Sequence, residues 1–162
     1  MNASILRCLG ALAIIVVTSP RTVDAAAPAG HYVVTAGSGT GNGTVYDSKS
    51  KLTWQQTVSP TTYTWADAKT YCAGVGASLG GTGWRVPTIK ELLSIVDFSQ
   101  PAGLYIDTNT FLSTPVGGKI GLEFWSSSPL AGSSSDAWSV NFIYGRSDSF
   151  HTANAYDVRC VR

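Results

Sequence analysis

The chain has 162 residues, with 11 Lys and Arg against 10 Asp and Glu, and its formal net charge is +1. Nucleic acid demands a basic face on its partner, so this balance argues against DNA or RNA binding. The length predicts one small domain, and the abundant Gly, Ser, Trp and Tyr residues are typical of a loop-rich extracellular domain with an aromatic core.

Residues 1–25 are predicted to be a secretory signal peptide. Arg7 supplies its positive charge, residues 9–17 form an apolar run, and Val23 and Ala25 stand at the −3 and −1 positions of a cleavage site. The run is about half the roughly 20 apolar residues that a membrane span needs. A retained anchor is the alternative, but we expect cleavage, no membrane span after processing, and a secreted, periplasmic or cell-envelope location.

Residues 26–43 are rich in glycine and are predicted to form a flexible lead-in. The folded domain is expected to span residues 44–162. It opens with a predicted β-hairpin, in which residues 45–47 and 51–54 flank a short polar turn.

Two helices follow in the predicted domain. The first begins after the N-cap residue Thr64 and stops at Gly74 and Gly76. One of its faces is expected to point to the core and carries Trp65, Ala68, Tyr71 and Cys72. The second helix opens with a capping box formed by Thr88 and Glu91. Its apolar stripe consists of Ile89, Leu92, Leu93 and Val96.

The remainder of the domain is predicted to consist of short strands and turns. The strands are expected at residues 124–126, 137–142 and 156–161. The last two alternate between apolar and polar residues, so each is expected to bury one of its faces. Helices early in the chain and antiparallel strands late in it predict a compact α+β domain.

Cys72 and Cys160 are the only cysteines that remain after processing, because Cys8 lies within the predicted signal peptide. An even pair in an exported chain is most simply a disulfide. A catalytic or metal-binding thiol pair is the alternative, but no His or further Cys is spaced near either residue. No metal ion and no cofactor is therefore predicted.

Six motifs in this order resemble the DUF1566 family, which is named for the C-terminal domain of the Legionella collagen-like adhesin. They are LTWQQ, TWADAKTYC, GWRVPTIKELLSIVD, FWSSS, AWSVNF and YDVRCVR, and the resemblance extends over residues 44–162. The family fold is similar to that of C-type lectins and of formylglycine-generating enzymes. The resemblance therefore implies a C-type-lectin-like domain, with two helices packed on short antiparallel strands.

The resemblance also implies a pairing for the cysteines and a class of binding partner. A lectin-like fold ties its first helix to its last strand by a disulfide, which is where Cys72 and Cys160 fall. Members of the family are mostly exported bacterial proteins, and the adhesin domain binds sulfated glycosaminoglycans. The near-zero net charge argues against sulfated glycans here. No collagen-like Gly-X-Y stretch precedes the domain, so trimerisation by such a stalk is in doubt and the oligomeric state is not predicted.

Several conspicuous residues are expected to be structural. The tryptophans are assigned to the core rather than to a sugar-stacking surface: Trp54, Trp65, Trp84, Trp125 and Trp138. Arg85 is expected to pair with a carboxylate or with loop carbonyls rather than with an anionic ligand. Calcium is not expected, because the strand with the sequence AWSVN lacks an adjacent Asn-Asp and the acidic residues are scattered along the chain.

A polar stretch near the C-terminus is the candidate ligand surface. Tyr, Arg, Asp, His and Asn side chains on loops that a rigid scaffold holds are typical of an adaptable recognition surface. An ordinary solvated loop is the alternative interpretation. The candidate residues are Tyr144, Arg146, Asp148, His151, Asn154 and Tyr156.

Together these features predict an exported binding module without enzymatic activity, which recognises a polysaccharide or a protein partner at the bacterial cell surface. A structural envelope component without a saturable ligand is the first alternative. An enzyme of the formylglycine-generating type is the second, but it needs a reactive cysteine pair near the end of the domain, where only Cys160 stands. Ser126, Asp136 and His151 supply the residue types of a hydrolytic triad without a strained nucleophile turn. No catalytic residue is predicted.

Overall fold

The computed structural model describes residues 30–37, 43–100, 103–115 and 122–162. The predicted signal peptide, residues 1–25, lies outside this part of the chain. No helix among the described residues is long and apolar enough to cross a membrane.

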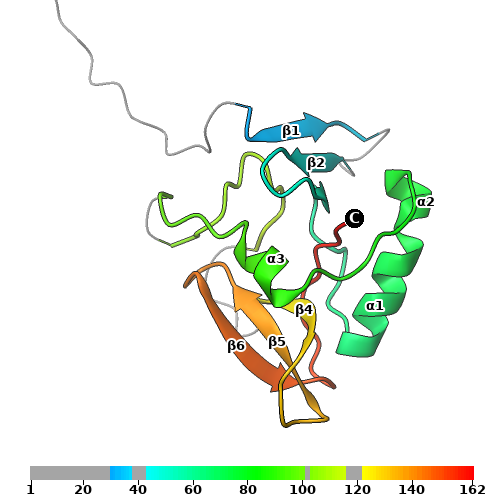
Figure 1. Ribbon diagram of the computed structural model, residues 1–162, viewed down its shortest axis with the longest axis vertical. Coiled ribbons are helices and arrows are strands. Elements are labelled where there is room, and N and C mark those ends of the chain that lie inside the picture. Colours follow the sequence, from blue (N-terminus) through cyan, green and yellow to red (C-terminus); the bar gives the residue numbers. More distant parts are fainter. Residues whose placement is uncertain (1–29, 38–42, 101–102, 116–121) are drawn as a thin grey trace, which may run out of the picture.

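In the described part of the chain, two three-stranded antiparallel sheets and three helices form an α+β domain, which confirms the predicted class (Figure 1). The first sheet has the order β1-β2-β3, formed by Tyr32–Thr35, Thr44–Asp47 and Thr53–Gln55. The second has the order β4-β5-β6, formed by Glu123–Pro129, Asp136–Asn141 and Arg146–His151.

Both predicted helices form at the predicted N-caps. The Thr64 hydroxyl accepts a hydrogen bond from the Asp67 N–H at the start of α1, Trp65–Gly74. The reciprocal capping box of Thr88 and Glu91 opens α3, Ile89–Leu93. The structure adds a single helical turn, α2, Gly76–Leu79, directly after α1. In space α3 packs on all three strands of the second sheet, whereas α1 contacts β4.

The first and last strands of the fold differ from the expectation. β1 lies within the stretch for which we predicted a flexible lead-in, where it pairs with β2 from Tyr32↔Asp47 to Thr35↔Thr44. Its two central residues are half exposed, Val33 at 51% and Val34 at 46%, so this edge strand has no continuous apolar face. β6 forms from the polar sequence RSDSFH, because β5 offers it a complete antiparallel register.

Residues 156–161, predicted to be a strand, are extended but form only isolated bridges. Their partners lie on separate elements: Tyr63↔Tyr156, Phe124↔Asp157, Arg85↔Val161 and Trp54↔Val161. No neighbour runs beside this segment far enough to build a ladder. The C-terminal segment, as we call residues 156–161, instead passes between the elements of the fold and is buried throughout (Figure 1).

The predicted disulfide is present and joins α1 to the C-terminal segment. The Cα atoms of Cys72 and Cys160 lie 5.5 Å apart, and both residues are fully buried. The bond lies within one of two apolar clusters, together with Trp84, Trp125 and Val158. The other cluster centres on Trp54, Phe111 and Phe124.

Three of the five tryptophans are core residues as predicted, namely Trp54, Trp84 and Trp125. Trp65 is half-buried and packs against the cluster that holds the disulfide, whereas the prediction is wrong for Trp138, which is half-buried and belongs to neither cluster. Trp65 stands at the first position of α1, where its indole N–H donates to the Ser126 carbonyl at 2.7 Å. Trp138 alternates along β5 with buried Ala137 and Ser139, and so lies on the other face of the strand.

Arg85 pairs with a carboxylate, as expected. Its two terminal nitrogens donate to the two Glu91 carboxylate oxygens at 2.8 and 2.7 Å. The same carboxylate accepts from the Thr88 N–H at 2.8 Å and completes the capping box. Glu91 therefore joins the loop before α3 to the first turn of that helix.

Candidate functional site

The structure brings together three residues of the candidate ligand surface. Tyr144 lies in the turn between β5 and β6 and is 60% exposed. The Arg146 guanidinium lies 5.0 Å from the centre of its ring. Arg146 also forms an ion pair with Asp148, with Nε and Oδ2 2.8 Å apart. Tyr144 and Arg146 are exposed, and neither lines the pockets described for this domain.

The other three candidate residues lie at the opposite end of β6, where His151 is the last residue of the strand and Asn154 and Tyr156 follow it. His151 Nδ1 accepts from the Ala153 N–H at 3.2 Å, and Asn154 donates to the Tyr156 hydroxyl at 3.2 Å. Tyr156 is only 9% exposed, and its ring packs against those of Trp125 and Phe150. Its assignment to a ligand surface is therefore wrong, because both faces of the C-terminal segment are covered.

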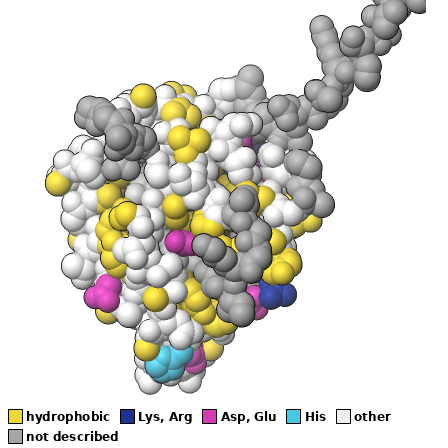
Figure 2. Space-filling model, turned by 180° about the vertical axis from the view of Figure 1, so that it is seen from behind, with side chains coloured by type: hydrophobic (Ala, Val, Ile, Leu, Met, Phe, Trp, Pro, Cys, Tyr) yellow, Lys and Arg dark blue, Asp and Glu magenta, His cyan; other side chains and the backbone are white. Residues whose placement is uncertain are grey.

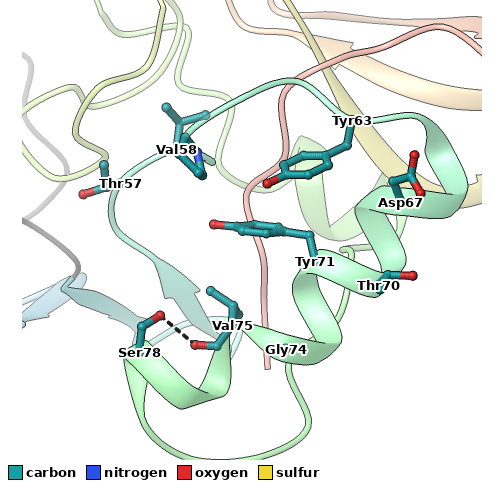
Figure 3. Close-up of a pocket in the computed structure, with 10 residues that line it drawn as sticks. Thr57, Val58, Tyr63, Asp67, Thr70, Tyr71, Gly74, Val75 and Ser78 are labelled. Carbon is teal, nitrogen blue, oxygen red and sulfur yellow. Dashed lines mark hydrogen bonds between the residues drawn. The ribbon is translucent and has the colours of Figure 1, made fainter.

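A hollow of about 840 Å³ lies elsewhere, between the helices α1 and α2 and the segment that leads into α1 (Figure 3). One wall consists of Asp67, Thr70, Tyr71, Gly74, Val75 and Ser78. The other wall consists of Thr57, Val58, Pro60 and Tyr63. We call these ten residues the tyrosine pocket.

Two stacked tyrosines dominate the pocket. The rings of Tyr63 and Tyr71 lie 4.9 Å apart at an interplanar angle of 21°. Both hydroxyls point to the same side, toward Val58 (Figure 3). Burial raises the pKa of the Tyr71 hydroxyl above its ordinary value of 10.0, so this group is neutral near pH 7. It therefore keeps a proton that it can donate to a ligand.

Tyr71 is held from behind by the core. Its hydroxyl oxygen accepts a hydrogen bond from Gln55 Nε2 at 2.8 Å. Gln55 is 2% exposed, and its Oε1 accepts from the Cys160 N–H at 3.2 Å. Because Cys160 is bonded to Cys72, the residue after Tyr71, both the backbone and the hydroxyl of this tyrosine are tied to the disulfide.

Tyr63 is anchored by the same C-terminal segment. It exchanges two backbone hydrogen bonds with Tyr156, at 2.8 and 3.0 Å. The Trp125 indole N–H also donates to the Tyr63 carbonyl, at 2.9 Å. Two tyrosines from different elements thus share one rigid support, which fixes the spacing of their rings before any ligand arrives.

The sequence interpretation missed this pocket, although a signal for part of it was present. Tyr71 was placed on the core face of α1, together with Ala68 and Cys72. The residues three and four positions apart on that helix, Asp67, Thr70, Tyr71 and Gly74, form a stripe of small, polar and aromatic side chains. The opposite wall gave no signal, because residues 57–63 form no helix or strand.

Charged groups are sparse in and around the site. Asp67 is the single charged side chain among the described residues that line the tyrosine pocket. On the face drawn in Figure 2, acidic and basic side chains are few among the hydrophobic and neutral polar ones. No group of three or more His, Cys, Asp and Glu in the described part of the chain is arranged to hold a metal ion. The pocket is thus suited to stacking and hydrogen bonding.

Comparison with known families gives one match. The family model described as the Lcl C-terminal domain matches residues 43–162, which include every residue of the tyrosine pocket and both cysteines of the disulfide. None of the curated proteins compared with this chain matches it.

Proposed function

Because this chain belongs to the family of the Lcl C-terminal domain, we propose that it is an exported binding module that holds a stretch of polysaccharide in the tyrosine pocket. The module acts at the bacterial cell surface and catalyses no reaction. The observation that carries the proposal is the rigid pair of stacked tyrosines inside an open hollow.

The chemistry of the walls supports a sugar ligand. A pyranose ring has apolar C–H faces and a rim of hydroxyls, so it needs an aromatic surface and a few well-placed hydrogen-bonding groups. Tyr63 and Tyr71 supply the aromatic surface, while the hydroxyls of Thr70 and Tyr71 and the Asp67 carboxylate supply polar partners. The volume of about 840 Å³ falls in the range of about 300–1,000 Å³ that is typical of ligand sites.

Three observations support a function without catalysis. Cys160 is engaged in the disulfide with Cys72, so it offers no thiol for chemistry of the formylglycine-generating type. Ser126 is fully buried, and its hydroxyl donates to the Trp138 carbonyl at 2.7 Å. His151 uses Nδ1 to accept a backbone hydrogen bond. The residue types of a hydrolytic triad therefore serve local structure.

We also propose that the domain is a member of the C-type-lectin-like folds. Two features support this assignment: the disulfide that joins α1 to the C-terminal segment, and the place of the second sheet in the sequence, after both main helices. The exposed group of Tyr144, Arg146 and Asp148 remains the second candidate for a contact, with a protein partner as its ligand.

Binding of the purified chain to an array of bacterial and synthetic glycans tests the proposal. Thr70→Trp fills the pocket from an exposed position of α1, so we expect the glycan signal to fall at least tenfold without loss of thermal stability. Ala73→Trp is the matched control, because Ala73 is also exposed on α1 but does not line the pocket. Absence of any glycan signal would refute the proposal. A signal that survives Thr70→Trp but is lost in Tyr144→Ala would assign binding to the other surface.

A further inference from the structure

The charge of the tyrosine pocket narrows the class of sugar that fits it. Asp67 lies at the rim of the pocket beside Tyr63 (Figure 3). Its Oδ2 accepts a hydrogen bond from the Thr64 hydroxyl at 2.7 Å. Its Oδ1 accepts none from the described residues, so one carboxylate oxygen is available to a ligand.

No basic side chain among the described residues forms an ion pair with Asp67. Lys69 is two residues away on α1, but its ammonium lies 3.1 Å from the centre of the Trp65 ring. The remaining arginines have other partners: Arg85 pairs with Glu91, Arg146 with Asp148, and Arg162 lies over Trp84. Arg159 is fully buried. Asp67 therefore gives the wall of the pocket one negative formal charge that no described basic side chain pairs with.

A negative pocket discriminates between sugars that stack equally well. Tyr63 and Tyr71 contact the ring faces, which differ little among hexopyranoses. A sulfate or a carboxylate on the sugar would meet Asp67 as a like charge, whereas an ammonium would meet an opposite one. An ammonium also gains from the face of a tyrosine ring, and Lys69 over Trp65 shows the same kind of contact on the next face of α1.

We propose that the tyrosine pocket selects amine-bearing sugars, with Asp67 as the residue that recognises the ammonium of a 2-amino-2-deoxyhexose unit. This inference rests on the proposed function, since it assigns the ligand class of the same pocket. It also excludes sulfated polysaccharides from this pocket. The expected preference over the N-acetylated sugar is about fivefold, as for an ion pair that is partly exposed to water, and it weakens as salt is added.

Three oligosaccharides of one length test the inference: a glucosamine hexamer, an N-acetylglucosamine hexamer and a heparin hexasaccharide. Their affinities for the purified chain are measured by calorimetry in mildly acidic buffer, in which the free amines carry protons. We expect the glucosamine hexamer to bind most tightly and the heparin fragment most weakly. Asp67→Asn should remove the difference between the first two hexamers, because it should weaken binding of the glucosamine hexamer more than binding of the acetylated one.

Asp136→Asn is the matched control, because the Asp136 carboxylate likewise accepts from a nearby hydroxyl, that of Ser133 at 2.7 Å, but lies outside the pocket. This variant should keep the full preference. Equal affinities of the two hexamers, both lost in Thr70→Trp, would overturn the amine selectivity and leave polysaccharide binding in place. Tightest binding of the heparin fragment, or a preference that persists in Asp67→Asn, would also overturn the inference. A failure of the proposed function is separate, since it appears as no glycan binding at all or as glycan binding that Thr70→Trp does not affect.

Discussion

Removal of the disulfide should cost the domain a large share of its stability. Cys72 and Cys160 are 88 residues apart in sequence, so reduction frees a long loop in the unfolded chain. The chain-entropy relation for a loop of this length gives about 4–5 kcal/mol. A domain of this size is stable by roughly 5–15 kcal/mol, so the double variant Cys72→Ser, Cys160→Ser should unfold roughly 10–20 °C lower.

Equilibrium unfolding in urea, followed by tryptophan fluorescence, measures the change directly. Part of the loss will come from two buried serine hydroxyls, because both cysteines are fully buried. Ala68→Ser places one hydroxyl in the same cluster and serves as the control, with an expected cost of about 1–2 kcal/mol. A double variant that loses no more than Ala68→Ser would refute the assignment of this bond as a main source of stability.

Three further substitutions test other parts of the fold. Hydrogen bonding to Arg85 lowers the Glu91 pKa to about 2, so the stability that ionised Glu91 contributes is complete above about pH 4.5 and is lost as the pH falls toward 2. Glu91→Gln should therefore lower the free energy of unfolding at pH 7 by about 1–2 kcal/mol, a figure that allows for the 46% exposure of the Arg85 side chain. Acid denaturation curves should show the difference in stability between variant and parent disappear toward pH 2. Arg159→Met leaves the Gln55 carbonyl without its hydrogen-bond donor and should lower the free energy of unfolding by about 3 kcal/mol, measured in urea. An unchanged free energy of unfolding would show that the buried guanidinium adds no net stability. Gly145→Ala should lower the free energy of unfolding by about 1–2 kcal/mol, because the φ angle of Gly145 is +62° and the new Cβ would lie 2.5 Å from the Phe98 ring. Adding Phe98→Ala should relieve the close contact but not the unfavourable φ angle. Thermal melts in which Gly145→Ala is as stable as the parent would contradict this account of backbone strain.

Local signals in the sequence predict the helices well. Thr64 and the Thr88–Glu91 capping box lie within a few residues of the groups that they satisfy, so they specify helix starts without tertiary information. The disulfide was also predictable, because an even cysteine pair leaves one pairing. β6 was not, since its polar sequence becomes a strand only when β5 is beside it.

The tyrosine pocket depends on contacts that no local pattern encodes. Tyr63 and Tyr71 meet because the C-terminal segment, almost 90 residues later in the chain, bonds to the backbone of one and, through Gln55, to the hydroxyl of the other. The alternation in YDVRCVR predicts a strand with one exposed face, and therefore misplaced Tyr156. The same alternation of apolar and polar residues occurs here in a segment that different elements cover on all sides, so it does not indicate an exposed face.

The course of the C-terminal segment has a consequence for cooperativity. It bonds to the loop before α1, to β3, to β4 and to the loop before α3, so its release would disrupt both sheets at once. Neither half of the domain can then open while the other stays closed, and the amide protons that hold Tyr63 and Gln55 should exchange with solvent only through global unfolding. The edge strand β1, which pairs with β2 alone among the described strands, should exchange much earlier. The proposed binding site is thereby expected to stand on the slowest-exchanging part of the molecule.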